Sequence, residues 1–135
     1  KHILTSVVFV VLSFPALALG EEVTFADLVE RDGLYYKKVT EVPFTGKVTG
    51  LQQGRFKNGV MEGPWVSYHK NGELNRKGTY KNGKRDGPWV SYHDNGQLFS
   101  KGTYKDGKRE GPWVFYDPNG QLKFKRTYKD GKKVK

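Results

Sequence analysis

The feature that most constrains this chain is a segment of 24 residues that occurs three times in succession. The copies span residues 63–86, 87–110 and 111–134, and each begins with Gly-Pro-Trp-Val. The first two copies are identical at 18 of 24 positions, and the last two at 16 of 24. A fixed period of this length indicates a repeat array, in which each unit buries its apolar side chains against its neighbours.

Turn signals divide each copy into two strands. Asn-Gly or Asp-Gly pairs, with spacings that alternate between 13 and 11 residues, begin at Asn58, Asn71, Asn82, Asn95, Asp106, Asn119 and Asp130. Such pairs favour type I′ turns, because both central residues take positive φ. The segments between them are rich in aromatic and β-branched residues and leave no room for a crossover helix. The sequence therefore predicts an all-β fold: an elongated single-layer antiparallel β-meander with rows of side chains and no pocket.

The register of each hairpin is left open by the sequence. Equivalent residues of adjacent copies should stand two strands apart, about 9.6 Å. If Asn71 and Gly72 form a two-residue loop, Trp65 lies opposite Gly78 and its ring can cover the bare backbone. If the loop has three residues, Trp65 lies opposite Lys77 instead.

The first twenty residues have a different character from the rest. An apolar run from Ile3 to Leu12 follows a short basic start, and small residues follow the run up to Gly20. This pattern predicts a cleaved signal peptide over residues 1–20, with an uncleaved membrane anchor as the alternative. Cleavage of this segment predicts a mature chain that is secreted or periplasmic and has no transmembrane span. Since the sequence contains no Cys, the chain is predicted not to be a lipoprotein.

The remaining residues divide into a lead-in and the array. Residues 21–43 are predicted to form an N-terminal cap, in which a capping-box pattern at residues 24–27 could start a short helix. Residues 44–62 read as a degenerate repeat. Residues 63–86 and 87–110 are repeats 1 and 2, and residues 111–135 form repeat 3 with a basic C-terminal end.

The repeated unit resembles the MORN repeat, in the variant found in bacterial proteins named after YwqK-type antitoxin components. The residues that carry the resemblance are Gly78, Tyr80, Asn82, Gly83, Lys84, Gly87, Trp89 and Tyr92. The resemblance covers about residues 44–135. It implies an elongated β-sheet that contacts proteins or lipids and does not catalyse a reaction. Together with the export signal, an antitoxin role implies a target outside the cytoplasm.

The sequence predicts no catalytic, cofactor or metal site. A GxxxxGK match begins at Gly78, but Arg85 follows it and a strand takes the place of the helix that a phosphate loop requires. His69, His93 and Asp117 occupy equivalent positions, about 9.6 Å apart, whereas ligands of one metal ion converge to about 2 Å from it. They read as solvated residues at strand ends, and the chain is predicted not to be an enzyme.

Positive charge is concentrated in the repeats. The whole chain has a net charge of +10, and residues 63–135 hold 17 Lys and Arg against 7 Asp and Glu, while residues 21–62 hold 6 against 7. Basic side chains at the turns should form a ladder along one edge of the sheet. The candidate polyanion-binding residues are Lys81, Lys84, Arg85, Lys105, Lys108, Arg109, Lys129 and Lys132. The alternative is that these side chains only keep a β-rich surface soluble and unpaired.

A second candidate surface follows from differences between the copies. Phe99, Phe115 and Phe124 occur where the other copies are mostly polar, and they are candidate partner-binding residues. Extra packing in the last repeat is the alternative. We therefore expect a non-enzymatic exported scaffold that binds a protein or an anionic envelope component, lipid or polysaccharide. The alternative is an antitoxin-like or immunity protein that neutralises a specific toxin outside the cytoplasm; nucleic acid fits the charge but not the export signal.

Overall fold

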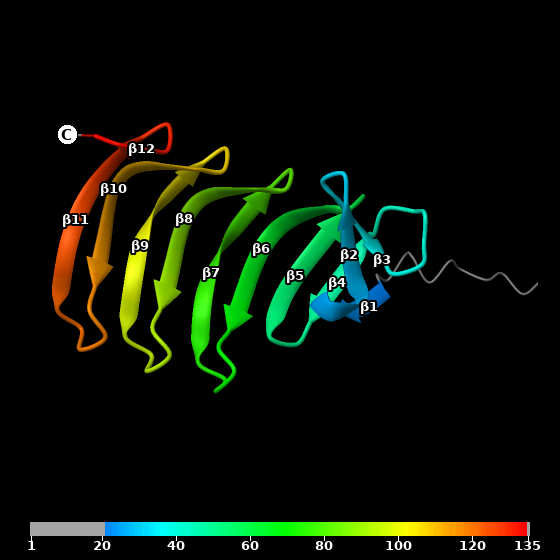
Figure 1. The fold of residues 1–135 in the computed structure, drawn as a ribbon, viewed down its shortest axis with the longest axis horizontal. Coiled ribbons are helices and arrows are strands. Elements are labelled where there is room, and N and C mark those ends of the chain that lie inside the picture. The colour runs from blue at the N-terminus through cyan, green and yellow to red at the C-terminus, as the bar shows by residue number, and fades with distance from the viewer. Residues whose placement is uncertain (1–20, 135) are drawn as a thin grey trace, which may run out of the picture.

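The fold was examined in a computed structural model, which describes residues 21–134; the predicted signal peptide lies outside the described residues. Strands connected by short turns follow one another along the chain in Figure 1. The strands are β1 (Glu21–Thr24), β2 (Leu28–Arg31), β3 (Leu34–Lys37), β4 (Gly46–Thr49), β5 (Gln52–Lys57), β6 (Val60–Tyr68), β7 (Leu74–Lys81), β8 (Lys84–Tyr92), β9 (Leu98–Lys105), β10 (Lys108–Tyr116), β11 (Leu122–Lys129) and β12 (Lys132–Lys133).

One long sheet contains most of these strands. Its ten strands are ordered β1-β4-β5-β6-β7-β8-β9-β10-β11-β12, and β2 and β3 form a separate hairpin. From β4 onward each strand pairs antiparallel with the next one in the chain. Figure 1 shows the result as an elongated sheet, one layer deep over the repeats. The predicted all-β, single-layer meander is confirmed.

The lead-in departs from a simple meander at one place. β1 pairs with β4 in parallel, with Glu21 opposite Gly46 and Thr49 opposite Thr24. A parallel pair needs a long connection, and residues 25–45, which include the β2–β3 hairpin, supply it. The all-antiparallel expectation therefore holds for the array but not for its first edge.

The turns at one end of the array are tight. The residue before glycine has a φ of +50° at Asn58, Asn82, Asp106 and Asp130, and the glycine that follows each also has positive φ. Asn and Asp adopt this conformation more readily than other non-glycine residues. The predicted two-residue turns with positive φ at both positions are confirmed for these four pairs.

The turns at the opposite end are longer than predicted. Asn71 does not have positive φ, and its side-chain oxygen instead accepts a hydrogen bond from the amide of Glu73 at 2.9 Å. The type I′ prediction for Asn71, Asn95 and Asn119 is therefore wrong. Trp65 nevertheless lies opposite Gly78, because a bulge next to Tyr68 absorbs the longer loop.

The strands bend near the tight turns. Gly87 has a φ of +79°, and the register between β7 and β8 shifts around it. Residues other than glycine rarely adopt this backbone conformation, so the strand bends at the glycine of the Gly-Pro-Trp motif. Figure 1 shows β6, β8 and β10 curving close to the tight turns that precede them.

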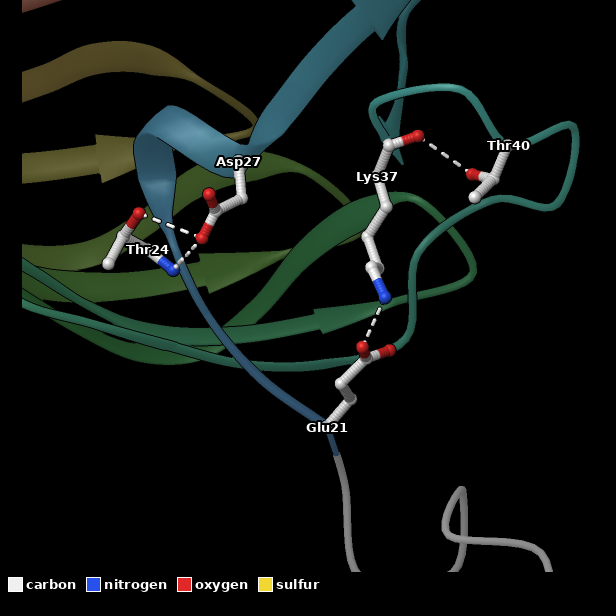
Figure 2. A network of polar contacts seen from close by, with 5 residues as sticks. All are labelled: Glu21, Thr24, Asp27, Lys37 and Thr40. Carbon is white, nitrogen blue, oxygen red and sulfur yellow. Dashed lines mark hydrogen bonds and ion pairs between the residues drawn. The ribbon is translucent and has the colours of Figure 1, made fainter.

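The cap closes the N-terminal end of the array. Figure 2 shows Asp27 accepting hydrogen bonds from the backbone amide and the hydroxyl of Thr24, at 2.8 and 2.9 Å. The predicted capping box is present, but the helix that it starts is a single 3₁₀ turn, Phe25–Asp27. Phe25 packs edge-on against Trp65 with ring centroids 6.3 Å apart. The lead-in thus covers an aromatic ring at the end of the repeat array.

Figure 2 also shows how the β2–β3 hairpin is fastened to β1. The ammonium group of Lys37 forms an ion pair with Glu21, and the hydroxyl of Thr40 donates a hydrogen bond to the carbonyl of Lys37 at 2.7 Å. The ion pair joins the two ends of the lead-in, and the hydrogen bond fixes the chain that follows β3.

Replacing Asp27 with Ala should loosen the cap in a pH-dependent way. The hydrogen bonds from the backbone and hydroxyl of Thr24 hold the pKa of Asp27 below its usual value of 3.8. A lowered pKa means that the ionised carboxylate stabilises the fold above pH 3.8 and that this contribution is lost as the pH falls through the lower, folded-state value. Thermal melts should give wild type a higher melting temperature than Asp27→Ala at neutral pH, and the difference between the two melting temperatures should shrink in acid. A difference in melting temperature that does not change with pH would contradict the role of the ionised Asp27 carboxylate.

Candidate functional site

The repeats present two different faces. We call the side that carries Trp65, Trp89 and Trp113 the aromatic face and the opposite side the lysine face. Side chains alternate between the two sides of a strand, so both faces repeat with the array. Each can therefore contact an extended partner at more than one repeat.

On the aromatic face, each tryptophan ring lies on a glycine of the preceding strand. A Cβ atom built on Gly78 would stand 2.2 Å from the ring of Trp89, so only glycine fits under the indole. The indole N–H donates to the carbonyl of Thr79 at 3.1 Å, which fixes the ring in this position. The sequence predicted that Trp65 could cover Gly78, but Trp65 lies on Gly54 and Gly78 is covered by Trp89 of the next repeat.

Tyrosine rings fill the spaces between the tryptophans. Tyr80 stands edge-on between Trp65 and Trp89, with centroid separations of 5.7 and 5.2 Å. Tyr104 repeats the arrangement between Trp89 and Trp113 at 6.1 and 5.1 Å. Edge-to-face pairs of this kind contribute about 0.5–1.5 kcal/mol each beyond the area they bury. The aromatic row thus links consecutive repeats and takes the place of a second layer.

Two arginines are built into this row. The guanidinium of Arg85 lies 4.8 Å from the ring centre of Trp89 and donates to the hydroxyl of Tyr104 at 3.0 Å. Arg109 repeats this on Trp113 and the next tyrosine hydroxyl. Burial lowers the pKa of Arg85, but hydrogen bonds with tyrosine hydroxyls outweigh this and leave the pKa raised, so the side chain stays charged.

On the lysine face, lysines meet in pairs at the tight turns. Lys81 lies directly opposite Lys84, Lys105 opposite Lys108, and Lys129 opposite Lys132. We call these six residues the lysine ladder. Like charges directly opposite each other in a sheet are destabilising, so their repetition on three successive turns is not explained by the fold.

The turns of the ladder are stacked closely. A Cβ atom on Gly107 would lie 3.5 Å from the side chain of Lys84, and one on Gly131 would lie 3.4 Å from Lys108. Each of these lysine stems therefore runs over the next turn. The lysine pairs therefore recur at the edge of the sheet that carries the tight turns.

The nearby carboxylates of the described residues form no salt bridge with the ladder lysines. Glu62 accepts a hydrogen bond from the amide of Asn82 at 2.8 Å, and Glu110 accepts one from the amide of Asp130 at 3.0 Å. These glutamates fix the turns of the following repeat. Within residues 21–134, none of the six ladder lysines forms a salt bridge.

The structure corrects the predicted membership of the ladder. Arg85 and Arg109 were expected beside Lys84 and Lys108, but they lie on the aromatic face. The reason is the strand alternation, which sends consecutive residues after a tight turn to opposite sides. The structure therefore brings six of the eight candidate polyanion-binding residues together and separates the two arginines from them.

The histidines connect repeats. His69 is half-buried, and its Nε2 atom lies 2.9 Å from the carbonyl oxygen of Tyr92 in the next repeat. His93 makes the same contact with Tyr116. The histidines lie at strand ends, as predicted, but the prediction that they are solvated is wrong. Each is half-buried and contacts the last residue of a strand in the next repeat. Within the described residues, no group of three His, Asp or Glu side chains is placed to hold a metal ion.

The repeat pattern and this geometry agree with a comparison against known families. A MORN repeat variant profile matches residues 61–82, 85–106 and 109–130, three units that coincide with the three stacked hairpins. This chain contains three MORN repeats. Each MORN repeat supplies one tryptophan, one tyrosine and one tight turn to the rows described above.

Other comparisons add little. A comparison with curated proteins gave no match. A crystal structure of accessory secretory protein 1, 2 and 3 in Streptococcus pneumoniae is similar over 83% of this chain and 20% of its own, with 16% sequence identity and a TM-score of 0.38. This chain thus spans about a fifth of the length of that protein, and a likeness of this degree supports no functional argument.

The three candidate phenylalanines lie together in the second and third MORN repeats. Phe99 is 6.2 Å from Phe115, and Phe115 is stacked on Phe124 at 4.5 Å between ring centres. Phe115 is only 7% exposed, whereas Phe99 is 44% exposed. Phe115 therefore packs within the array, and Phe99 offers the accessible ring of the cluster.

Two open hollows adjoin on the aromatic face, between β5 and β10. One of about 390 Å³ lies over Trp65 and Ser67, and one of about 560 Å³ lies over Trp89 and Phe99. Sequence reasoning predicted no pocket, because the flat rows of a single sheet suggested none. The hollows form where the small residues Ser67, Ser91 and Ser100 lie between larger side chains.

No helix within residues 21–134 is both long and apolar enough to span a bilayer.

Proposed function

We propose that this chain is an exported, non-enzymatic scaffold whose lysine ladder binds an anionic component of the cell envelope. The observation that carries the proposal is the pairing of Lys81 with Lys84, in which neither lysine forms a salt bridge with a described residue, repeated on the next two tight turns. A row of anionic headgroups or acidic sugars would relieve this repulsion at several points at once. The proposal of export is supported by the apolar N-terminal segment of the sequence. The proposal of a scaffold role is supported by the MORN repeats, because such repeats often serve as binding scaffolds.

The proposal is tested by binding to vesicles that contain anionic lipid and to an acidic polysaccharide, at low and high salt. Replacing Lys84, Lys108 and Lys132 with Gln should weaken binding by about tenfold or more. A matched variant replaces Lys77, Lys101 and Lys125, which lie on the same face but pair with valines. It removes the same charge, and we expect a smaller loss from it.

The ladder variant should fold at least as well as wild type, because like-charge repulsion is removed. A thermal melt checks this before binding is compared. Equal losses in the two variants would show that only net charge matters, and binding that does not weaken with salt would contradict an electrostatic site.

A second candidate function is an antitoxin-like or immunity protein that binds a specific toxin outside the cytoplasm. The 44% exposed ring of Phe99, beside the larger hollow, favours a protein partner. Capture of one toxin-like protein that resists high salt and is lost in Phe99→Ala would support this function over the first.

A further inference from the structure

We propose that the two hollows of the aromatic face form one groove, which binds an extended acidic peptide segment of a partner protein. The groove lies on the opposite face from the lysine ladder and does not depend on it. Its defining residues are Ser67, Arg76 and Arg85, with Arg109 one repeat further on.

The hollows are continuous because they share walls. Asn75, Arg76 and Arg85 line both of them. Together they extend across strands β5 to β10, which is about 24 Å at the usual spacing of about 4.8 Å between strands. A peptide of about eight residues in polyproline II conformation, at about 3.1 Å per residue, covers this length.

The charge of the groove calls for an anionic ligand. Three arginines line it, against the single carboxylate of Asp94. None of the three forms a salt bridge with another described residue. Arg85 and Arg109 are held in place by an indole ring and a tyrosine hydroxyl, and the N–H groups that these contacts leave free suit a carboxylate.

A buried hydroxyl points to the same ligand independently. Ser67 is 7% exposed, and its Oγ atom has no hydrogen-bond partner. It lines the smaller hollow directly opposite Arg76. In the next repeat the equivalent Ser91 is satisfied by Ser100 at 2.5 Å. A ligand oxygen beside Arg76 would give the hydroxyl of Ser67 the acceptor that the fold does not supply.

The groove also offers an apolar contact and a charge spacing that suit a peptide. The exposed ring of Phe99 lies at the end of the larger hollow, next to the edge of His93 at 4.9 Å. An apolar side chain of the peptide would cover this ring. Arg85 and Arg109 occupy equivalent positions about 9.6 Å apart. Residues three apart in a peptide with polyproline II conformation lie on one side of it and are about 9.3 Å apart.

The test is a titration of the purified protein with a labelled peptide of about ten residues, long enough to cross the groove, that carries Glu at every third position and one Phe. A second peptide has Gln in place of Glu. The Glu peptide should bind, and the Gln peptide should bind about tenfold more weakly or worse. Arg76→Gln should weaken Glu-peptide binding by about tenfold, while Lys77→Gln, the same charge change on the other face, should change it less than about twofold.

Ser67→Ala separates binding from folding. It removes a hydroxyl that the fold leaves unsatisfied, so the melting temperature should stay the same or rise, while peptide affinity falls by about threefold to tenfold. A lower melting temperature with unchanged affinity would overturn the role of Ser67 and with it the proposal.

Three other outcomes would also overturn the peptide groove. They are the absence of Glu-peptide binding, equal losses in Arg76→Gln and Lys77→Gln, and Arg76-dependent binding of an oligogalacturonate in place of the peptide. The ladder variant with Gln at Lys84, Lys108 and Lys132 should keep peptide affinity within about twofold. This keeps the outcome for the groove separate from the outcome for the proposed envelope binding.

Discussion

Replacing Trp89 with Ala is expected to lower the free energy of unfolding by about 3–5 kcal/mol. The ring is 4% exposed and packs edge-on against tyrosines on both sides. It also covers Gly78 and supports the guanidinium of Arg85. Since the sheet over the repeats is one layer deep, no second layer can move in to fill the space.

Urea unfolding followed by circular dichroism measures this loss, with Phe99→Ala as the matched control. Phe99 is also an aromatic residue of the second repeat, but it is 44% exposed. Its removal should cost less than about 1 kcal/mol. Similar losses for the two variants would contradict the assignment of Trp89 to the core.

Replacing Gly78 with Ala is expected to destabilise the protein by about 1–3 kcal/mol. The added Cβ would lie 2.2 Å from the ring of Trp89, so the ring or the strand must move. The effect should change sign when the ring is absent. In a Trp89→Ala background, Gly78→Ala should stabilise the protein by about 0.5–1 kcal/mol, because alanine is more favourable than glycine inside a strand.

The double-mutant cycle of these two positions therefore predicts a coupling energy of more than about 1 kcal/mol. Unfolding curves of wild type, both single variants and the double variant supply it. If Gly78→Ala costs the same with and without the indole ring, Trp89 does not lie on this glycine.

Much of the array could be predicted from the sequence, because its turn signals are local. Asn82-Gly83 and its equivalents require only two residues with positive φ, which the dipeptide itself favours. Asn71-Gly72 has the same letters but forms a different loop. There the side chain of Asn71 also donates to the carbonyl of Asp94 in the next repeat, at 2.7 Å, and a dipeptide carries no information about that neighbour.

The candidate site was predicted only in part for a similar reason. The two-residue turn at Asn82-Gly83 places Lys81 opposite Lys84, and strand alternation places Lys84 and Arg85 on opposite sides, so both features follow from local sequence rules. The identity of the glycine under each ring depends on which way the indole turns, and Trp89 could have turned toward Gly102, which lies directly opposite it. The unsatisfied hydroxyl of Ser67 depends on the burial of one atom, which no repeat pattern reveals.

The stacking of each tryptophan over the glycine of the preceding strand holds the single layer together without a second one. Nuclear Overhauser contacts from the indole ring protons of Trp89 test it directly. Contacts to the α-protons of Gly78, shifted upfield by the ring, are the predicted result. Ring contacts to Gly102 in place of Gly78, or to neither glycine, would contradict the account.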